Sequence, residues 1–463
     1  MIQDIYKNPI LLTDVYNLSH FYLKQNVDYE ASQIYNRSKP MILYGLNERI
    51  RQIFDVKIEV EMIMEAEEYC KKMGFKEFPT EMWYRIADKF KGHLPLRVQA
   101  IPDGYWVPKG TPFCQITNTE EGFGELVTWF EAPLLHIAFA SGCATRAFEI
   151  KKYLEENKLR KNRVHSFGFR GHNSLENAYY AGTAWNLFLI GTDDFHTTGH
   201  TDPTAISSIP ATAHKTIQQF DTELEAYIYS IDSTASKGEN MLSLVIDTYN
   251  PAKFIYDHAY NIALHAKKKG ITVIFRPDSG DVKLQAVEIH RIMKTMELLS
   301  NTGVIIGEGM TFEKVKEYDK FFLNAGVPLD YINYGMGAGF FKDIDRDYLG
   351  FAMKTCFSNG KPRMKFSADP IKRSIPDFVN IIEDGLNLAV DYTRDGLYED
   401  VYYFDERSSR PKTWVQNWKD IKEIANNQLD TQKEIILMPM VEQKIKTFED
   451  KYLGEKNEMQ RSN

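Results

Sequence analysis

The chain has 463 residues and a formal net charge of −8, with 43% hydrophobic and 26% charged residues. This length exceeds the usual size of one hydrophobic core, and we expect two domains or one large α/β body with an accessory layer. The acidic balance argues against general binding to nucleic acids or anionic membranes. Four well-separated cysteines without a CxxC pair argue against a disulfide framework and a structural zinc site. We therefore expect a cytoplasmic protein with no leader peptide and no membrane span.

The first region, up to about residue 140, mixes short helices with strands and turns. Its segment HLPLRVQAIPDGYWVPKGTPFCQITNT carries Pro and Gly at hairpin spacing, which predicts antiparallel strands. The sequence after about Lys354 returns to irregular and β-like segments such as GLYEDVYYFDERSS. Both ends of the chain are therefore expected to differ in structure from the middle.

The middle region alternates between strands and helices. The pattern SGCATRAFEIKKYLEEN predicts a helix with Ser141 as its N-cap, and NSLENAYYAGTAWNLF predicts a second helix. The segments MLSLVID, ITVIF and GVIIG are each followed by a helical pattern, near 251–269, 282–299 and 311–323, and LDYINYG by a glycine-rich turn. With further strands near 165 and 187, this alternation predicts parallel pairing through right-handed crossovers and much of a barrel.

Polar residues and glycines follow the predicted strands at the point where each strand ends. They are Asp193, Asp247, Arg276 with Asp278, Gly307 with Glu308, and the cluster Gly335–Gly339. Barrels and open α/β sheets carry their active sites at the carboxyl ends of their strands. One such residue is usually part of a turn, but five such positions favour a site at this edge.

The residue types at this edge indicate phosphate and sugar chemistry. In FRPDSGD, Arg276 could hold a phosphate with two hydrogen bonds, while Asp278 could hold ribose hydroxyls or Mg²⁺. The alternative is a turn with a surface ion pair. The YGMGAGFF loop offers backbone N–H groups to a phosphate, although most glycine-rich turns bind nothing. Basic residues then gather in an acidic chain, at Arg346, Lys354, Lys365, Lys372 and Arg373.

Two further motifs contain candidate site residues. In SFGFRGHNS, the Phe167 ring could stack on a planar heteroaromatic ring and Arg170 could contact a polar substituent or a phosphate. In SSIPATAHKT, His214 stands among small residues that shield its imidazole little. The alternatives are a core phenylalanine, a surface arginine and a structural histidine.

The stretch LFLIGTDDFHTTGHTD admits two other interpretations. His196 and His200 are four residues apart, the spacing of two zinc ligands on one helix face. The intervening Thr-Thr-Gly and the following Pro203 argue against a helix, so we do not expect a metal site there. DDFHTTGHT also resembles the loop of type I phosphoribosyltransferases, in which Asp193 and Asp194 would hold ribose hydroxyls.

The ordered set of motifs resembles the nicotinamide phosphoribosyltransferase family of type II phosphoribosyltransferases. The motifs lie in the family's order at compatible spacing: LLTDVYNLSHFYLKQ, YGL, GHLP, FGFRG, GTDD, IPATAHKT, DTYN, RPDSGD, GEG, YGMGAG, DRD and ADPIKRS. The resemblance implies an irregular TIM-like (β/α) barrel over residues 141–380. It also implies an α+β domain formed by residues 1–140 and about 380–463.

The resemblance assigns roles to individual residues. Phe167 and Tyr16, the latter from the second subunit of a homodimer, would sandwich a pyridine ring, with Asp193 on the carboxamide and Arg170 beside the ring. Asp247 would act near His214, the residue that ATP phosphorylates in the family. The remaining residues would contact the sugar and phosphates of phosphoribosyl pyrophosphate: Arg276, Asp278, Ser243, Gly307, Glu308, Gly337, Ala338, Arg346, Arg37, Lys354 and Lys365.

The implied reaction is transfer of a phosphoribosyl group to nicotinamide in NAD salvage. Displacement of pyrophosphate builds negative charge on the leaving group, which Mg²⁺ and basic residues stabilise. We expect Mg²⁺ to be held mainly through the substrate phosphates, and ATP to act as a co-substrate.

Two alternatives remain, a nicotinate phosphoribosyltransferase and a non-catalytic relative with a binding or signalling role. The Asp193 carboxylate favours an amide over a carboxylate substituent. The chain departs from the family pattern at Ala338, Glu308 and Asn250.

Overall fold

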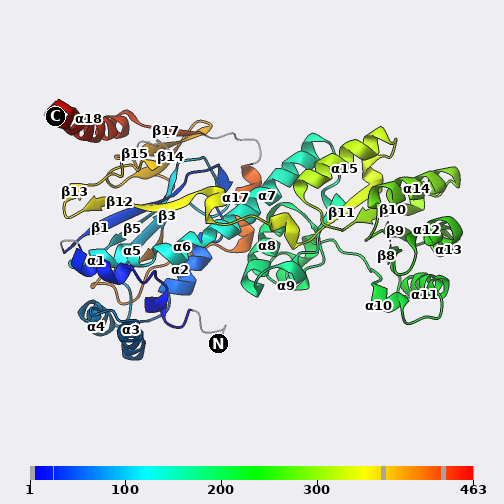
Figure 1. Ribbon diagram of the computed structural model, residues 1–463, viewed down its shortest axis with the longest axis horizontal. Coiled ribbons are helices and arrows are strands. Elements are labelled where there is room, and N and C mark those ends of the chain that lie inside the picture. Colours follow the sequence, from blue (N-terminus) through cyan, green and yellow to red (C-terminus); the bar gives the residue numbers. More distant parts are fainter. Residues whose placement is uncertain (1–5, 24–25, 367–371, 429–433, 462–463) are drawn as a thin grey trace. The chain divides into compact units, whose positions relative to one another are not determined.

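The computed structural model describes residues 6–23, 26–366, 372–428 and 434–461 (Figure 1). The chain forms two compact units, Met1–Thr145 with Asp343–Asn463, and Arg146–Lys342. The second boundary differs from the one that we expected near residue 380. The reason is that β12 (Phe351–Ser358) pairs antiparallel with β1 (Glu30–Asn36) in the first unit.

The first unit is built on a six-stranded antiparallel sheet in the order β13-β12-β1-β5-β3-β16. Its other strands are β13 (Lys361–Pro362), β5 (Pro112–Asn118), β3 (Leu96–Ala100) and β16 (Glu399–Tyr403). The predicted hairpin region forms the β3–β5 pair. Two small sheets accompany it, β14 (Asn380–Asp384) with β15 (Asn387–Asp391) and β17 (Ile435–Leu437), and β2 (Met41–Ile42) with β4 (Trp106–Val107).

One large apolar core holds this unit together. Apolar residues of β1, β3 and β5 are buried in it with those of the surrounding helices. Burial of these side chains is the main stabilising contribution, at about 25 cal/mol per Å² of apolar surface. The helices of the unit are α1 (Asn17–Leu23), α2 (Leu46–Phe54), α3 (Val60–Lys72), α4 (Thr80–Lys89), α5 (Gly124–Trp129), α6 (Glu131–Leu135), α16 (Arg346–Leu349), α17 (Trp418–Asn427) and α18 (Pro439–Arg461); α7 (Ile137–Glu156) contains the first boundary.

The second unit contains a six-stranded parallel sheet in the order β7-β6-β11-β10-β9-β8. The strands are β6 (Val164–Ser166), β7 (Gly191–Thr192), β8 (Met241–Val245), β9 (Thr272–Arg276), β10 (Thr302–Ile306) and β11 (Ile332–Met336). Helices lie between successive strands: α8 (Leu175–Phe188), α11 (Glu223–Ser236), α12 (Pro251–Lys253) continuing through a π-helical turn (Phe254–His258) into α13 (Ala259–Lys268), α14 (Val282–Thr295) and α15 (Phe312–Asn324). The predicted β–α alternation is confirmed.

An extended segment, residues 207–212, joins the two edge strands of this sheet. Ser207 bridges to Gly191 of β7, and Ala211 bridges to Ser243 of β8, both in parallel. The Thr192 N–H donates to the Ser207 carbonyl at 3.1 Å, and the Ser243 N–H donates to the Pro210 carbonyl at 2.8 Å. The sheet is thereby closed into an irregular barrel, which confirms the predicted fold class of an α/β barrel with an α+β unit formed by both ends of the chain.

Three local predictions were wrong. Ser141 is no N-cap, because α7 begins at Ile137 and the buried Ser141 hydroxyl accepts a hydrogen bond from the Tyr44 N–H instead. The strand expected near residue 187 is the last turn of α8, and the strand itself is the dipeptide β7. A short helix, α9 (Phe195–Thr198), forms where none was expected, and the N–H of Thr197 donates to the Asp194 carbonyl at its start.

All four cysteines are buried, and none forms a disulfide with another. No helix among the described residues has the length and apolar character needed to cross a lipid bilayer.

A buried ion pair links the 3₁₀ turn Lys161–Arg163, which precedes β6, to β11, α7 and α15. Arg163 and Asp319 are 0% and 2% exposed and form two hydrogen bonds, of 2.8 and 2.5 Å. The hydroxyls of Tyr153 and Tyr334 donate to the same carboxylate at 2.8 and 2.7 Å. All four hydrogen bonds depend on one carboxylate, so its loss leaves a guanidinium buried without a counter-charge.

We expect Asp319→Asn to lower the free energy of unfolding by about 3–5 kcal/mol, because the Arg163 charge is left uncompensated in the core. Chemical denaturation measures this. Asp330→Asn is the matched control, since Asp330 pairs with Arg160 at a position where both side chains are about half exposed, and it should cost about 1 kcal/mol or less. Equal losses in the two variants would contradict a special role for the buried pair.

Candidate active site

The carboxyl ends of the parallel strands meet at one rim of the second unit. Residues that end these strands or follow them within two positions are Phe167, Asp193, Asp247, Arg276, Gly307 and Gly337. Neighbouring strands are in register, so their ends lie side by side. The rim therefore gathers most of the residues that the sequence singled out in residues 146–342.

A cavity of about 230 Å³ lies inside the sheet of this unit. Its lining includes Phe167, Asp193 and Arg276 from the carboxyl ends of the strands, and Arg160 and Asp330 from the opposite ends. The buried Ser243 hydroxyl also lines it and has no hydrogen-bond partner in the structure. The cavity thus combines apolar walls with a few polar groups, as small-molecule sites commonly do.

The Phe167 ring lies against glycine backbone. A Cβ at Gly335 would lie 2.1 Å from Cε2 of Phe167, and a Cβ at Gly307 would lie 3.9 Å from the same atom. The Phe167 N–H donates to the Met336 carbonyl at 2.7 Å, which fixes the ring at the end of β11. The Cδ2–Cε2 side of the ring packs on these glycines, and Phe167 is only partly buried.

Asp193 is the exposed acid at the end of β7. The Ser208 hydroxyl donates to its Oδ1 at 2.6 Å, and the Asp193 N–H donates to the Ser166 carbonyl at 3.0 Å. His165, which lines the same cavity, has its pKa lowered by burial, an effect that Asp193 opposes. The cavity is therefore lined by a fixed carboxylate, by the Phe167 ring and by an imidazole whose pKa burial lowers.

A second group of ionisable side chains lies on the loops that follow β8 and β9 and at the start of α10 (His214–Ile217). The group consists of His214, Asp247 and Asp278. An imidazole nitrogen of His214 and a carboxylate oxygen of each aspartate lie within 4.8 Å of one another. Nδ1 of His214 lies 3.2 Å from the Thr248 hydroxyl, and the Ser279 hydroxyl donates to Oδ2 of Asp247 at 2.5 Å. Burial raises the pKa of Asp278, and Asp247 raises it further, whereas Arg276 lowers it.

This group is the one set of three close His, Cys, Asp or Glu side chains among the described residues. Oδ1 of Asp247 is buried and has no hydrogen-bond partner, so it can accept a cation. Carboxylate oxygens suit Mg²⁺, whereas an imidazole does not. The two aspartates therefore fit Mg²⁺, which we expected from the sequence to be held mainly through the substrate phosphates.

Arg276 connects the His214 loop to this group. Its guanidinium donates to the Thr212 carbonyl at 2.8 Å, and its Nε lies 3.3 Å from Oδ2 of Asp278. The Thr212 hydroxyl in turn accepts from the Val245 N–H at 2.9 Å. Arg276 is thus held in place at the rim while its side chain stays partly exposed.

The remaining rim residues lie on loops. Glu308 and Arg170 are exposed, and Gly307, Gly337 and Ala338 are half-buried. The Ala338 methyl group lies where a Cβ at Gly171 would approach it to 2.8 Å. The departure at Ala338 is therefore accommodated by a glycine on the facing loop.

Five predicted site residues belong to the first unit, and four of them form a basic cluster. Burial lowers the pKa of Lys354, and Arg37, Lys365 and Arg346 lower it further, whereas Glu131 raises it. Tyr16 is 57% exposed and lies near Glu131 and Asp14, which together with burial raise its pKa. Arg346 forms an ion pair with Asp347. Glu131 was not among the predicted residues, because an isolated acid before APLL carries no motif.

His196 lies in α9, and His200 lies two residues after the end of that helix. The two imidazole rings are close together. Their ring centroids are 4.9 Å apart, and Tyr179 contacts both rings. Among the described residues no third His, Cys, Asp or Glu completes a metal-binding group with them. The pair is an exposed aromatic cluster beside α8.

Two domain models and several proteins are similar to this chain. The model of the nicotinamide phosphoribosyltransferase N-terminal domain matches residues 8–98, and that of the nicotinate phosphoribosyltransferase (NAPRTase) family matches residues 162–361. The nicotinamide phosphoribosyltransferase of Xanthomonas campestris pv. campestris is 27% identical over 385 residues, which are 75% of this chain and 80% of that protein. That of Acinetobacter baylyi is 25% identical over 332 residues, 61% of this chain and 65% of that protein.

The chain belongs to the nicotinamide phosphoribosyltransferase family. It is a phosphoribosyltransferase with the type II fold. The crystal structure of human nicotinic acid phosphoribosyltransferase superposes with a TM-score of 0.64 at 14% identity, over 94% of this chain and 100% of that chain. The nicotinate-nucleotide pyrophosphorylase of Pyrococcus furiosus gives 0.61 at 16% identity, over 93% and 97%. At these identities the two structures show the fold alone.

The type I interpretation of the GTDD segment does not fit a member of this family, nor does it fit the structure. Asp194 is 3% exposed, and its carboxylate accepts hydrogen bonds from the Ser166 hydroxyl at 2.8 Å and the Phe169 N–H at 3.1 Å. Burial raises its pKa, and these two hydrogen bonds lower it. Asp194 is therefore turned into the protein, away from any ribose.

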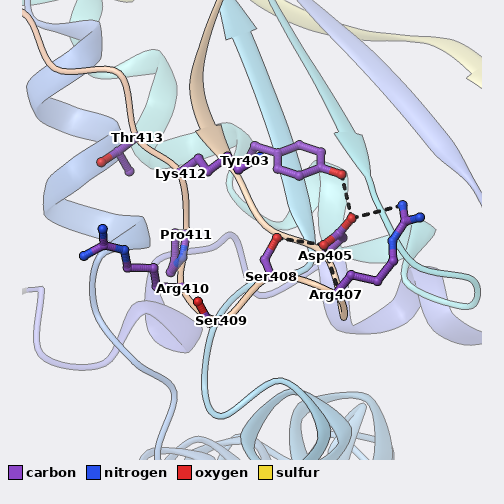
Figure 2. A pocket seen from close by; sticks show the side chains of 9 residues that line it. All are labelled: Tyr403, Asp405, Arg407, Ser408, Ser409, Arg410, Pro411, Lys412 and Thr413. Carbon is purple, nitrogen blue, oxygen red and sulfur yellow. Dashed lines mark hydrogen bonds and ion pairs between the residues drawn. The ribbon is translucent and has the colours of Figure 1, made fainter.

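A further hollow, in the first unit, contains none of the predicted site residues. It has a volume of about 980 Å³ and is lined by residues 403 and 405 and the loop 407–413. Figure 2 shows Arg407 and Arg410 on opposite sides of the loop, and the Ser408 and Tyr403 hydroxyls donating to Asp405 at 2.7 Å each. The basic groups of this hollow therefore do not converge on one point (Figure 2).

We expect Gly335→Ala to destabilise the protein by about 1–3 kcal/mol, because the new methyl group would displace the Phe167 ring. Thermal and urea unfolding measure the effect. Gly337→Ala is the matched control, since nothing lies within 4 Å of the place that its new methyl group would take and its φ is −76°. It should be neutral or stabilising by up to about 1 kcal/mol. Similar losses in both variants would show that the ring contact is not what requires glycine.

Proposed function

We propose that this phosphoribosyltransferase transfers the phosphoribosyl group of phosphoribosyl pyrophosphate to nicotinamide, giving nicotinamide mononucleotide and pyrophosphate in NAD salvage. The observation that carries the proposal is the fixed Asp193 carboxylate beside the Phe167 ring in the barrel cavity. The names of the curated relatives support the same substrate.

The part of the cavity lined by Phe167 and Asp193, called the pyridine slot below, would distinguish an amide substituent from a carboxylate. A pyridine ring stacked on Phe167 would place its substituent toward Asp193, whose carboxylate accepts hydrogen bonds but donates none. The amide NH₂ of nicotinamide supplies a donor. The carboxylate of nicotinate would meet a like charge in a partly enclosed site, which costs several kcal/mol at about 4 Å. Ser208 already occupies one oxygen of Asp193 as a donor, so the orientation of the carboxylate is set before the substrate binds.

The rim residues fit the sugar donor. Arg276 presents a guanidinium to a phosphate group, and the Gly337–Ala338 turn presents backbone N–H groups at the start of a short 3₁₀ helix. Asp247 and Asp278 would hold Mg²⁺, which neutralises the charge that develops on the departing pyrophosphate. In the reaction the ring nitrogen forms a bond to C1 of the ribose as the bond from C1 to the pyrophosphate oxygen breaks.

The cations of the first unit would complete the site in a homodimer. Tyr16 of the second copy would cover the exposed face of the pyridine ring, opposite Phe167. Arg37, Arg346, Lys354 and Lys365 would contact the phosphates. Two observations support this assignment. Tyr16 is 57% exposed, and Arg37, Arg346 and Lys365 lie close enough to Lys354 to lower its pKa.

His214 would couple the reaction to ATP. Its Nδ1 contacts the Thr248 hydroxyl, which leaves Nε2 as the nucleophile. Nε2 would attack the γ-phosphorus of ATP, the bond to the β,γ-bridging oxygen would break, and ADP would leave. The exposure of His214 and its position beside Asp247 and Asp278 support this step.

The decisive experiment offers the purified protein phosphoribosyl pyrophosphate and Mg²⁺ with either nicotinamide or nicotinate, with and without ATP. We expect faster turnover of nicotinamide and stimulation by ATP. Faster turnover of nicotinate would overturn the role of Asp193 and favour the nicotinate enzyme. The absence of turnover with either base would favour a non-catalytic relative. A mass of one chain in solution would overturn the shared site.

We expect Asp193→Asn to lower kcat/KM for nicotinamide by about 10- to 100-fold, since a charged hydrogen-bond acceptor is worth about 1.5–3 kcal/mol. Steady-state kinetics at saturating phosphoribosyl pyrophosphate measures this loss. His196→Ala, in the same loop, is the control and should change kcat/KM less than about twofold, as expected for an exposed side chain outside the cavity. Equal losses would mean that the loop as a whole matters and that Asp193 does not read the amide.

We expect His214→Ala to abolish the stimulation by ATP while leaving nicotinamide binding intact, because its imidazole lies with the Mg²⁺ group and does not line the cavity. Activity with and without ATP, together with acid-labile ³²P incorporation from γ-labelled ATP, measures this. Stimulation that persists in the variant would rule out the phosphohistidine.

A further inference from the structure

Phe167 lies in the short loop between β6 and the 3₁₀ turn Phe169–Gly171. The buried carboxylate of Asp194 accepts hydrogen bonds from residues at both ends of this loop. Asp194 accepts from the Ser166 hydroxyl through Oδ2 and from the Phe169 N–H through Oδ1. Ser166 precedes Phe167, and Phe169 follows it by two residues. The two oxygens of one carboxylate therefore fix both ends of the Phe167–Gly168 segment.

Among the described residues, the Asp194 carboxylate accepts hydrogen bonds from Ser166 and Phe169 and contributes none to the adjacent helix. It stands at the N-cap position of α9, but it makes no capping hydrogen bond to that helix. Thr197 and Thr198 of α9 instead use the Asp194 backbone carbonyl. The Asp194 N–H is held by the Thr192 hydroxyl at 3.1 Å, so the residue itself is fixed at the end of β7.

We propose that Asp194 is a positioning residue for the pyridine slot: it holds the Phe167 ring in the orientation that stacks on the substrate, while the adjacent Asp193 contacts the substrate. The Asp193 N–H donates to the Ser166 carbonyl, so the loop that reads the amide and the loop that stacks the ring are tied to each other. The inference rests on the proposed function, because it assigns the slot to a pyridine ring.

Asp194→Ala removes both hydrogen bonds, and we expect it to raise KM for nicotinamide about tenfold, equivalent to about 1.4 kcal/mol. KM for phosphoribosyl pyrophosphate should change less than about twofold, because its contacts lie on other strands. Asp194→Asn should restore KM to within about threefold of the wild type. The amide oxygen can accept from Phe169, and the amide NH₂ can donate to the Ser166 hydroxyl.

Ser166→Ala removes one of the two hydrogen bonds and keeps the carboxylate, so it should give an intermediate KM. It is the second variant if Asp194→Ala fails to fold. Asp202→Ala is the matched control, an acid of the same loop that caps a short 3₁₀ turn, and it should leave both KM values unchanged. Parallel rises of both KM values, or an Asp194→Asn variant as impaired as Asp194→Ala, would overturn the proposal.

Hydrogen exchange separates this proposal from the proposed function. In Asp194→Ala the amides of residues 167–171 should exchange faster than in the wild type, with β8, β9 and β10 unchanged. Unchanged exchange at 167–171 would overturn the positioning role even if nicotinamide is the substrate. If exchange at 167–171 is faster in Asp194→Ala but the wild-type protein does not use nicotinamide, Asp194 still fixes the loop and the proposed function is overturned.

Discussion

The site depends on the closure of a parallel sheet by a segment that is itself hardly a strand. Residues 207–212 bridge β7 on one side and β8 on the other, and this closure brings six strand ends to one rim. The same segment carries Ser208 to Asp193 and leads directly into His214. A shift of this segment would therefore displace Ser208, the hydrogen-bond partner of Asp193, and His214 together.

The glycines of the YGMGAG loop have two different tasks: one makes room for the Phe167 ring, and another leaves space for a phosphate. Taken as sequence, the YGMGAG loop indicates a phosphate cradle. In the structure Gly335, the first glycine of that loop, lies under the Phe167 ring, where any side chain would overlap it. Gly337, by contrast, has open space around it and remains available to a phosphate. One glycine-rich motif thus contains two physical constraints, which only the position of Phe167 distinguishes.

The periodic parts of the fold could be predicted from the sequence, and the short or context-dependent parts could not. Apolar runs such as those of β8 to β11 alternate with amphipathic helices, so their order and the rim that follows were predictable. β7 has two residues, too few for a periodic signal, and the apolar end of α8 therefore predicts a strand too early. Burial of Asp194 and the approach of Glu131 to Lys354 depend on residues distant in sequence, which no local pattern encodes.

Asp193 and Asp194 show how the environment, and not the residue type, decides the role of an acid. They are adjacent and chemically identical, yet β7 ends between a cavity and a core, so one side chain faces each. The exposed carboxylate keeps acceptor capacity for a ligand, because Ser208 uses one of its oxygens. The buried carboxylate is 3% exposed and accepts one hydrogen bond on each oxygen from protein donors, so a ligand in the cavity does not reach it. A carboxylate that faces a cavity can contact a substrate directly, whereas a buried one held by protein donors acts only through the loop that it fixes.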